Sequence, residues 1–259
     1  MMGYAIMAIA VLLQMNASSG FAMDPCQVAA EHGRLVVPVD RLERESRCLI
    51  AEVVTRPGAS TMIGPVLTPI RSELYAYLLD HPDIRALLMQ RLEMETCRFS
   101  PKGPNQFWVD DGDGAEGLLT VLYRDSSYRI YYIDGQHRSA LFATVRVKTV
   151  VFMNMVPIER NEEPPAVQVA LVSYTRFESR LLTGLARMFQ PLVARAVKRA
   201  LTREFGSSHQ LGGTIAQNPD RVRKAVASLP FDDSEDRRTF NALLETVPTT
   251  PASSLLSSP

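Results

Sequence analysis

The chain contains 259 residues, of which 46% are hydrophobic and 22% are charged, and its 28 basic side chains balance 28 acidic ones. This composition excludes a disordered chain, which needs low hydrophobicity or a high net charge, and it excludes collagen-like and other low-complexity classes. The sequence holds no run of about 18 apolar residues, which excludes a protein with several membrane-spanning helices.

The first residues predict a signal peptide. Residues 3–13 (GYAIMAIAVLL) carry no charge. This run is too short to span a bilayer, which takes about 20 residues per helix, but it suits the apolar core of a signal peptide. A polar stretch follows, and the small residues Gly20 and Ala22 match the pattern before a cleavage point. We therefore predict cleavage near Ala22 and export to the periplasm or the medium. The alternative is a cytoplasmic protein in which this segment forms a buried helix.

Residues 23–70 are predicted to form an N-terminal extension. Within it, the apolar segments 34–40 and 49–55 are strand candidates. The glycines and prolines between residues 57 and 69 predict a loop, because both residue types interrupt regular structure.

The middle of the chain changes from a helical to a strand period. Two helices are predicted at 72–80 and 82–92, the second with proline in its first turn, where proline is favoured. From residue 96 to residue 177 apolar and polar residues alternate, and short polar turns such as residues 125–127 separate the runs. Consecutive strands joined by short turns predict an antiparallel meander.

The longest helical pattern covers residues 179–205. Leucine and other apolar residues recur there at spacings of three and four, which predicts one apolar face. Pro191 is expected to kink or restart this helix. A C-terminal helical segment is predicted at 207–246, with a helix at 219–228, and residues 247–259 are expected to be a disordered tail.

The three cysteines, Cys26, Cys48 and Cys97, fit no zinc-binding pattern, because their number is odd and their spacing is wide. In an oxidising compartment, Cys48 and Cys97 could form a disulfide and leave Cys26 free. The alternative is three unpaired thiols.

The sequence IDGQHRSAL at residues 133–141 resembles the Asp-Gly-Gln-His-Arg signature of DGQHR-domain proteins in the ParB/sulfiredoxin-like superfamily. The resemblance implies an α+β domain in which a strand ends in a turn, a helix follows, and a nucleotide phosphate binds at the start of that helix. It further implies a nucleotide-binding protein associated with DNA modification or regulation. The implied phosphate-binding residues are Asp134, Gly135, Gln136, His137 and Arg138.

The order of the predicted elements is similar to that of the START-like, or SRPBCC, helix-grip superfamily. The similarity covers a helix pair near 72–92, the meander, and the long amphipathic helix with a central proline. It implies an α+β fold in which an antiparallel meander sheet wraps around the long helix, within a domain at 71–206. Residues 128–156 would then form one hairpin, and residues 134–136 a kink or bulge inside it. The long helix favours this resemblance over the DGQHR one.

The helix-grip resemblance implies a binding protein for an apolar small molecule or a lipid, held between the sheet and the long helix, with no nucleic-acid partner. Aromatic side chains of the sheet and the inward face of the helix are expected to contact the ligand, although the tyrosines would equally suit an ordinary sheet core. The expected ligand-binding residues are Tyr123, Tyr131, Tyr132, Leu185, Phe189 and Val193.

No motif in the sequence indicates a reaction. The four histidines lie at least 49 residues apart, and the run DDGDG at residues 110–114 lacks the ligand spacing of a calcium loop. We therefore predict no metal and no cofactor, and we favour a binding protein over an enzyme. The basic side chains between Arg180 and Arg203 suit either solvent or anionic lipid headgroups. The backbone after Arg138 distinguishes the two resemblances: a strand indicates the helix-grip fold, and a helix indicates the DGQHR domain.

Overall fold

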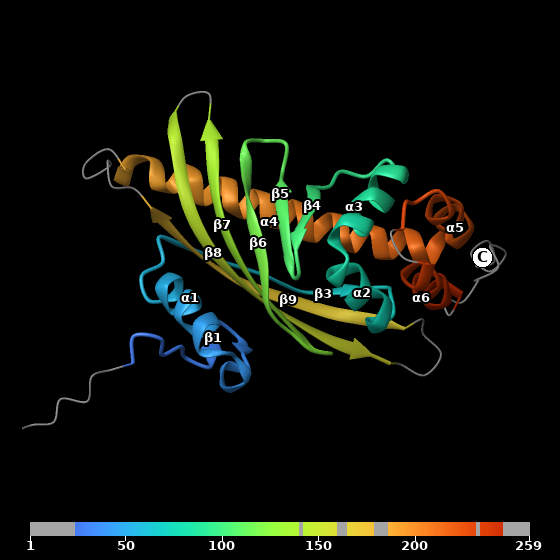
Figure 1. Cartoon of the computed structure of the whole chain (residues 1–259), viewed down its shortest axis with the longest axis horizontal. Coiled ribbons are helices and arrows are strands. Elements are labelled where there is room, and N and C mark those ends of the chain that lie inside the picture. The colour runs from blue at the N-terminus through green and yellow to red at the C-terminus, as the bar shows by residue number, and fades with distance from the viewer. Residues whose placement is uncertain (1–23, 140–141, 160–164, 179–185, 232–233, 246–259) are drawn as a thin grey trace, which may run out of the picture.

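The computed structural model describes residues 24–139, 142–159, 165–178, 186–231 and 234–245. A curved sheet in this part of the chain has a long helix on one face and the N-terminal segment on the other (Figure 1). In chain order the elements are β1 (Glu31–His32), β2 (Leu35–Val36), the short 3-10 helix η1 (Val39–Arg41), α1 (Arg44–Val54), β3 (Ala59–Thr68), α2 (Ser72–Asp80), α3 (Pro82–Arg91), β4 (Arg98–Gly103), β5 (Gln106–Asp110), β6 (Ala115–Arg124), β7 (Tyr128–Ser139), β8 (Phe142–Ile158), β9 (Ala166–Glu178), α4 (Ala186–Gln217), α5 (Pro219–Ala227) and α6 (Ser234–Glu245).

The main sheet confirms the predicted antiparallel meander. Its seven described strands lie in the order β3-β9-β8-β7-β6-β5-β4, and every neighbouring pair is antiparallel. From β4 to β9 each strand pairs with the next one along the chain. Only β3 departs from this order, because it pairs with β9 at the far edge of the sheet.

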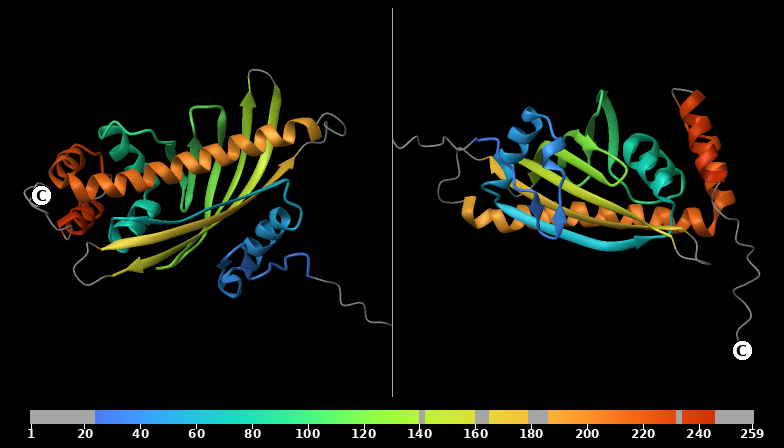
Figure 2. Two further views of the ribbon diagram at one scale, coloured as in Figure 1. Left: turned by 180° about the vertical axis from the view of Figure 1, so that it is seen from behind. Right: turned by 90° about the horizontal axis from the view of Figure 1, so that it is seen from below.

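Helix α4 crosses the concave face of the sheet along its length, as the view from behind shows (Figure 2). It packs closely on β3, where a Cβ atom at Gly212 would lie only 2.4 Å from the Thr68 Cγ2 atom. Glycine at this position therefore lets the helix approach the strand. A meander that wraps a long C-terminal helix is the helix-grip architecture that the sequence predicts.

Helices α2 and α3 close one end of the concave side. Pro82 occupies the first turn of α3, where its missing N–H group has no helical partner to lose. Leu74 and Leu88 are completely buried under the two helices, in the same apolar cluster as the inner side chains of the sheet. The C-terminal helices join this cluster, since the Phe240 ring of α6 stacks on Tyr77 at 5.1 Å.

The N-terminal segment packs on the convex face of the sheet and forms a second apolar cluster there. Ile50 and Val53 of α1 are buried against the sheet with Phe152. The His32 ring stacks on Phe152 with 4.2 Å between the ring centroids. Burial lowers the pKa of His32, so the neutral imidazole is the form that this packing favours.

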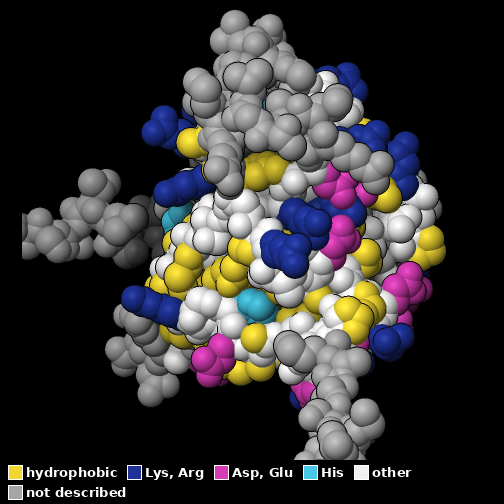
Figure 3. Space-filling view, turned by 90° about the vertical axis from the view of Figure 1, so that its left-hand side faces the viewer, with side chains coloured by type: hydrophobic (Ala, Val, Ile, Leu, Met, Phe, Trp, Pro, Cys, Tyr) yellow, Lys and Arg dark blue, Asp and Glu magenta, His cyan; other side chains and the backbone are white. Residues whose placement is uncertain are grey.

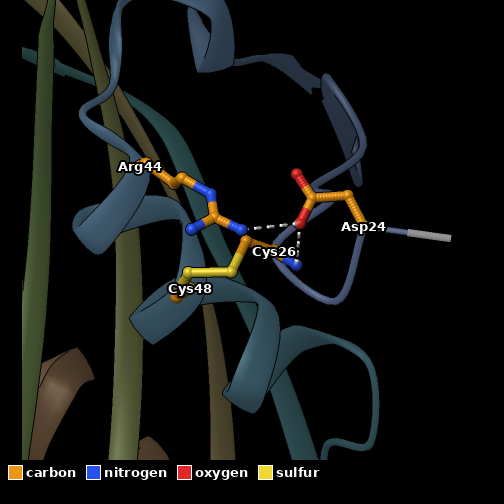
Figure 4. The surroundings of a disulfide bond; sticks show 4 residues. All are labelled: Asp24, Cys26, Arg44 and Cys48. Carbon is orange, nitrogen blue, oxygen red and sulfur yellow. Dashed lines mark hydrogen bonds and ion pairs between the residues drawn. A yellow bond between two sulfur atoms is a disulfide. The ribbon is translucent and has the colours of Figure 1, made fainter. Parts of the chain in front are cut away.

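The disulfide joins Cys26 to Cys48 and not Cys48 to Cys97, so the predicted pairing is wrong. Cys48 lies in α1 on the convex side, whereas Cys97 follows α3 and borders a cavity on the concave side, so the sheet separates the two thiols. The bond ties the start of the described chain to α1, and Asp24 there accepts a hydrogen bond from the Cys26 N–H and lies 3.8 Å from Arg44 (Figure 4).

Three other predictions need correction. The predicted strand at 49–55 overlaps α1, which ends at Val54, because burial follows a helical stripe that includes Ile50 and Val53. The predicted loop contains strand β3, whose register shifts at the Gly64–Pro65 step, as an edge strand tolerates at a bulge. Strand β3 therefore belongs to the main sheet, although it precedes the predicted domain boundary at residue 71. The long helix α4 continues past its predicted end at residue 205 to Gln217.

Candidate ligand-binding cavity

A cavity of about 220 Å³ lies between α4 and the concave face of the sheet, with α2 and α3 at one end. Its walls are mainly apolar. The sheet contributes Leu119, Val121, Tyr131, Ile133 and Val151, among others. Water is held poorly by apolar walls, and empty apolar cavities bind apolar molecules. The cavity is therefore a candidate ligand-binding site.

The helical period places one continuous face of α4 against this cavity. The helix residues that line it are Ala196, Val197, Ala200, Leu201, Glu204, Phe205 and Ser208. Their spacing of one, three and four residues is that of a single helix face. The opposite face, which includes Thr202 and Gly206, is exposed. Ala196 and Ala200 are the small residues of the inward face, and they leave room for a ligand.

A pair of glycines forms part of the opposite wall. Gly117 of β6 and Gly135 of β7 lie directly opposite each other in the sheet, and both line the cavity. A Cβ atom at Gly117 would lie 2.6 Å from the Gly135 Cα atom, so only glycine permits this approach of the two strands. The sheet therefore presents backbone rather than side chains to the cavity at this point.

Polar groups gather where α3 meets α4. Arg85 of α3 is 6% exposed, and its guanidinium forms an ion pair with Glu204 and donates a hydrogen bond from Nη1 to the Ser208 Oγ atom at 2.9 Å. The Glu204 carboxylate also accepts a bond from the Cys97 N–H at 3.4 Å. The Phe99 ring centroid lies 5.5 Å from the guanidinium carbon. All of these residues border the cavity.

The tyrosines and the cysteine at this end are neutral at ordinary pH. Burial raises the pKa of Tyr75 to about 12 and raises the pKa of Tyr131 as well. Burial, followed by the Glu204 carboxylate, raises the pKa of the Cys97 thiol. A thiol held in this form is a poor nucleophile, so the cavity offers hydroxyl and thiol donors rather than an activated cysteine.

A salt-bridged loop flanks the cavity. Asp111 lies after β5 and borders the cavity, and its carboxylate lies 3.4 Å from the Arg203 guanidinium of α4. Arg203 also pairs with Asp113 and donates a hydrogen bond to the Asp111 carbonyl oxygen at 3.1 Å. The acidic run at residues 110–114 thus holds the β5–β6 turn against α4.

Of the tyrosines predicted to contact a ligand, the structure places only Tyr131 at the cavity. Tyr132 belongs to the convex cluster, because neighbouring residues of a strand point to opposite faces. Tyr123 packs against the same convex cluster, although it is two residues from the cavity-lining Val121. A register shift between Val121 and Tyr123 reverses the alternation there.

None of the three residues of the long helix that were predicted to contact a ligand has a described side chain. Leu185 lies outside the described residues. Phe189 and Val193 lie within the bounds of α4, but their side chains are outside the described set. Their predicted contact with a ligand therefore stays a prediction.

The DGQHR sequence lies inside strand β7 and not at a turn before a helix. Asp134 to His137 pair in register with β6 and β8, so the phosphate turn implied by that resemblance is wrong. Gly135, Gln136 and His137 all border the cavity. Gln136 and Arg138 donate hydrogen bonds to Glu116 of β6, which borders the cavity as well. Strand β8 runs on to Ile158, which is the outcome that indicates the helix-grip fold.

Sequence reasoning missed the polar end of the cavity. The helical period places Glu204, within the predicted helix, and Ser208, beyond its predicted end at residue 205, on the same face as Ala200 and Leu201. The sequence around Arg85 does not indicate a buried side chain, because an arginine in a helix is usually exposed. Its burial depends on contacts with α4, more than 100 residues away.

Basic side chains of α4 lie on its outer face. Arg195, Lys198 and Arg199 are exposed. On the end of the molecule at the left of Figure 1, Lys and Arg side chains are interspersed with hydrophobic and acidic ones (Figure 3). The predicted contact with an anionic membrane surface stays a prediction. None of the helices in the described ranges is long and apolar enough to cross a membrane. The described residues also contain no group of three or more His, Cys, Asp or Glu placed to hold a metal ion.

No protein-family model matches the chain, and no curated protein matches it. Solved structures that resemble it include a conserved protein from Geobacillus kaustophilus, with 12% identity over 60% of this chain and 94% of that chain and a TM-score of 0.41. A START superfamily protein from Mycobacterium smegmatis has 15% identity over 59% of this chain and 97% of that chain, with a TM-score of 0.36. Ara h 8.0201 has 15% identity over 60% of this chain and 99% of that chain, with a TM-score of 0.34. The helix-grip assignment rests on the order of the strands and the course of α4.

Proposed function

We propose that this protein binds an apolar small molecule or a lipid in the cavity between α4 and the sheet. The observation that carries the proposal is the cavity of about 220 Å³ with mainly apolar walls. Burial of an apolar surface contributes roughly 25 cal/mol per Å², so such walls favour an apolar guest over water. The glycine pair and the small residues of α4 keep this space free of side chains.

The test is binding of N-phenyl-1-naphthylamine, a neutral apolar fluorophore whose emission rises in an apolar environment. We expect saturable binding to the wild-type protein. Ala200→Trp, which places a large side chain in the cavity from α4, should weaken this binding at least tenfold. Thr202→Trp is the matched control, because residue 202 lies two positions further along α4 and is exposed. It should bind as the wild type does.

Circular dichroism and urea unfolding of the two variants check that both remain folded. Equal binding by folded Ala200→Trp and the wild type would show that the fluorophore occupies another site, and the proposed function would then lose its support.

We also propose that the protein is exported and that its mature form begins at Met23. The disulfide between Cys26 and Cys48 supports this proposal, because disulfides persist mainly in oxidising compartments. After native expression and fractionation, intact-mass measurement should find a chain that begins at Met23, with two fewer hydrogens than the reduced form. A full-length chain with reduced thiols in the cytosolic fraction would contradict export.

A further inference from the structure

We propose that Arg85 selects ligands that carry a neutral hydrogen-bond acceptor, such as a ketone oxygen, on an otherwise apolar body. This inference rests on the proposed function and specifies the chemical class of its ligand. Its basis is a buried donor at the polar end of the cavity from which no described residue accepts a hydrogen bond.

The Nε–H group of Arg85 is that donor. The Nε atom is buried and has no hydrogen-bond partner among the described residues, although the side chain lines the cavity and the residue is only 6% exposed. Buried polar groups are nearly always hydrogen-bonded, so each exception needs an explanation. An acceptor supplied by a ligand inside the cavity provides one.

The rest of the guanidinium is held in place. Nη1 donates to Ser208, Nη2 contacts Glu204, and the Phe99 ring lies 5.5 Å from the guanidinium carbon. The Ser208 hydroxyl in turn donates to the Glu204 carbonyl oxygen at 2.9 Å. Because both terminal nitrogens are engaged by α4, the guanidinium cannot rotate to satisfy Nε from the same partners. The donor is therefore fixed before a ligand arrives, which lowers the entropy cost of binding.

The charges around Arg85 favour a neutral acceptor. The Glu204 carboxylate already balances the guanidinium, and the second carboxylate at this end, that of Asp111, faces Arg203. An anionic ligand head would therefore approach two carboxylates without an unpaired cation. Tyr75, Tyr131 and Cys97 are neutral there and add no charge. A cationic head would meet Arg85. A neutral oxygen can accept a hydrogen bond from the Nε–H group without repulsion from the carboxylates or from the guanidinium.

Three matched probes test this inference: naphthalene, 2-acetylnaphthalene and 2-naphthoate, each measured by displacement of N-phenyl-1-naphthylamine. They share one ring system and differ in carrying no oxygen, a neutral acceptor, or an anion. We expect the ketone to bind the wild type about tenfold more tightly than naphthalene, because hydrogen bonds to charged donors are among the stronger ones. We expect 2-naphthoate to bind more weakly than the ketone.

Arg85→Lys keeps the positive charge beside Glu204 but removes Nε. It should reduce the preference for the ketone over naphthalene to twofold or less. Arg91→Lys, at an exposed position of the same helix, is the control and should keep the full preference. A wild type without the preference, or an Arg85→Lys variant that retains it, would overturn the inference. Continued naphthalene binding in that case would leave the proposed function intact. If 2-naphthoate binds the wild type more tightly than the other two probes, the inference is also overturned.

If Arg85→Lys also loses naphthalene, the decision passes to Glu204→Gln, which keeps the size of the side chain and removes the balancing charge. In that variant the affinity for 2-naphthoate should rise about tenfold relative to the affinity for the ketone. The absence of any such rise would overturn the inference. If none of the probes and no fluorophore binds the wild type, the proposed function fails first, and the inference fails with it.

Discussion

Replacement of Asp80 by alanine should lower the free energy of unfolding by about 3–4 kcal/mol, because it leaves a buried guanidinium without its counter-ion. Arg129 of β7 has a side chain that is only 4% exposed. Its Nε and Nη2 atoms donate to the two Asp80 carboxylate oxygens at 2.9 Å each. This pair ties the end of α2 to the centre of the sheet.

Arg124→Ala is the matched control, since Arg124 reaches the same carboxylate at 3.9 Å from a side chain that is 50% exposed. Exposed ion pairs contribute about 1 kcal/mol or less, so this variant should unfold in urea close to the wild-type midpoint. If the two variants lose equal amounts of unfolding free energy, burial of the Arg129 guanidinium does not add to the effect of losing its counter-ion.

Removal of the disulfide by Cys26→Ser with Cys48→Ser should cost roughly 3 kcal/mol, as the chain-entropy model gives for a sequence separation of 22. The measurement is urea unfolding with and without a reductant. Reductant should destabilise the wild type by a similar amount and leave the double variant unchanged, since Cys97 is a free thiol. A wild type that reductant does not affect would indicate that the bond does not form or does not constrain the chain.

Periodicity predicted those parts of the fold in which one local pattern persists. The helices α2 and α3, the meander and α4 follow from alternation and from helical spacing over long segments. The segment at 49–55 was misassigned because a short apolar run of leucine, isoleucine and valine suits both a strand and a buried helix face. Strand β3 was missed because Gly64 and Pro65 indicate a loop, and only its pairing with the distant strand β9 makes it a strand.

The candidate site was predicted in position but only partly in its residues. Strand alternation alone cannot tell which of Tyr131 and Tyr132 faces the helix, because the two faces of this sheet are both covered. The pairing of Arg85 with Glu204 joins two helices across 119 positions, and no local pattern encodes it. The DGQHR sequence shows the converse: five residues that resemble a phosphate turn lie within strand β7, whose register with β8 continues through His137 and shifts only after it.

The central claim is that an apolar ligand occupies the space between α4 and the concave face of the sheet. Anomalous diffraction from crystals soaked with 2-bromonaphthalene tests this claim directly, because the bromine atom locates the probe without ambiguity. We predict one strong bromine peak inside the cavity, between Ala200 of α4 and Ile133 of β7. Bromine peaks confined to the convex face or the outer surface, in crystals of a protein that binds the probe saturably in solution, would contradict it.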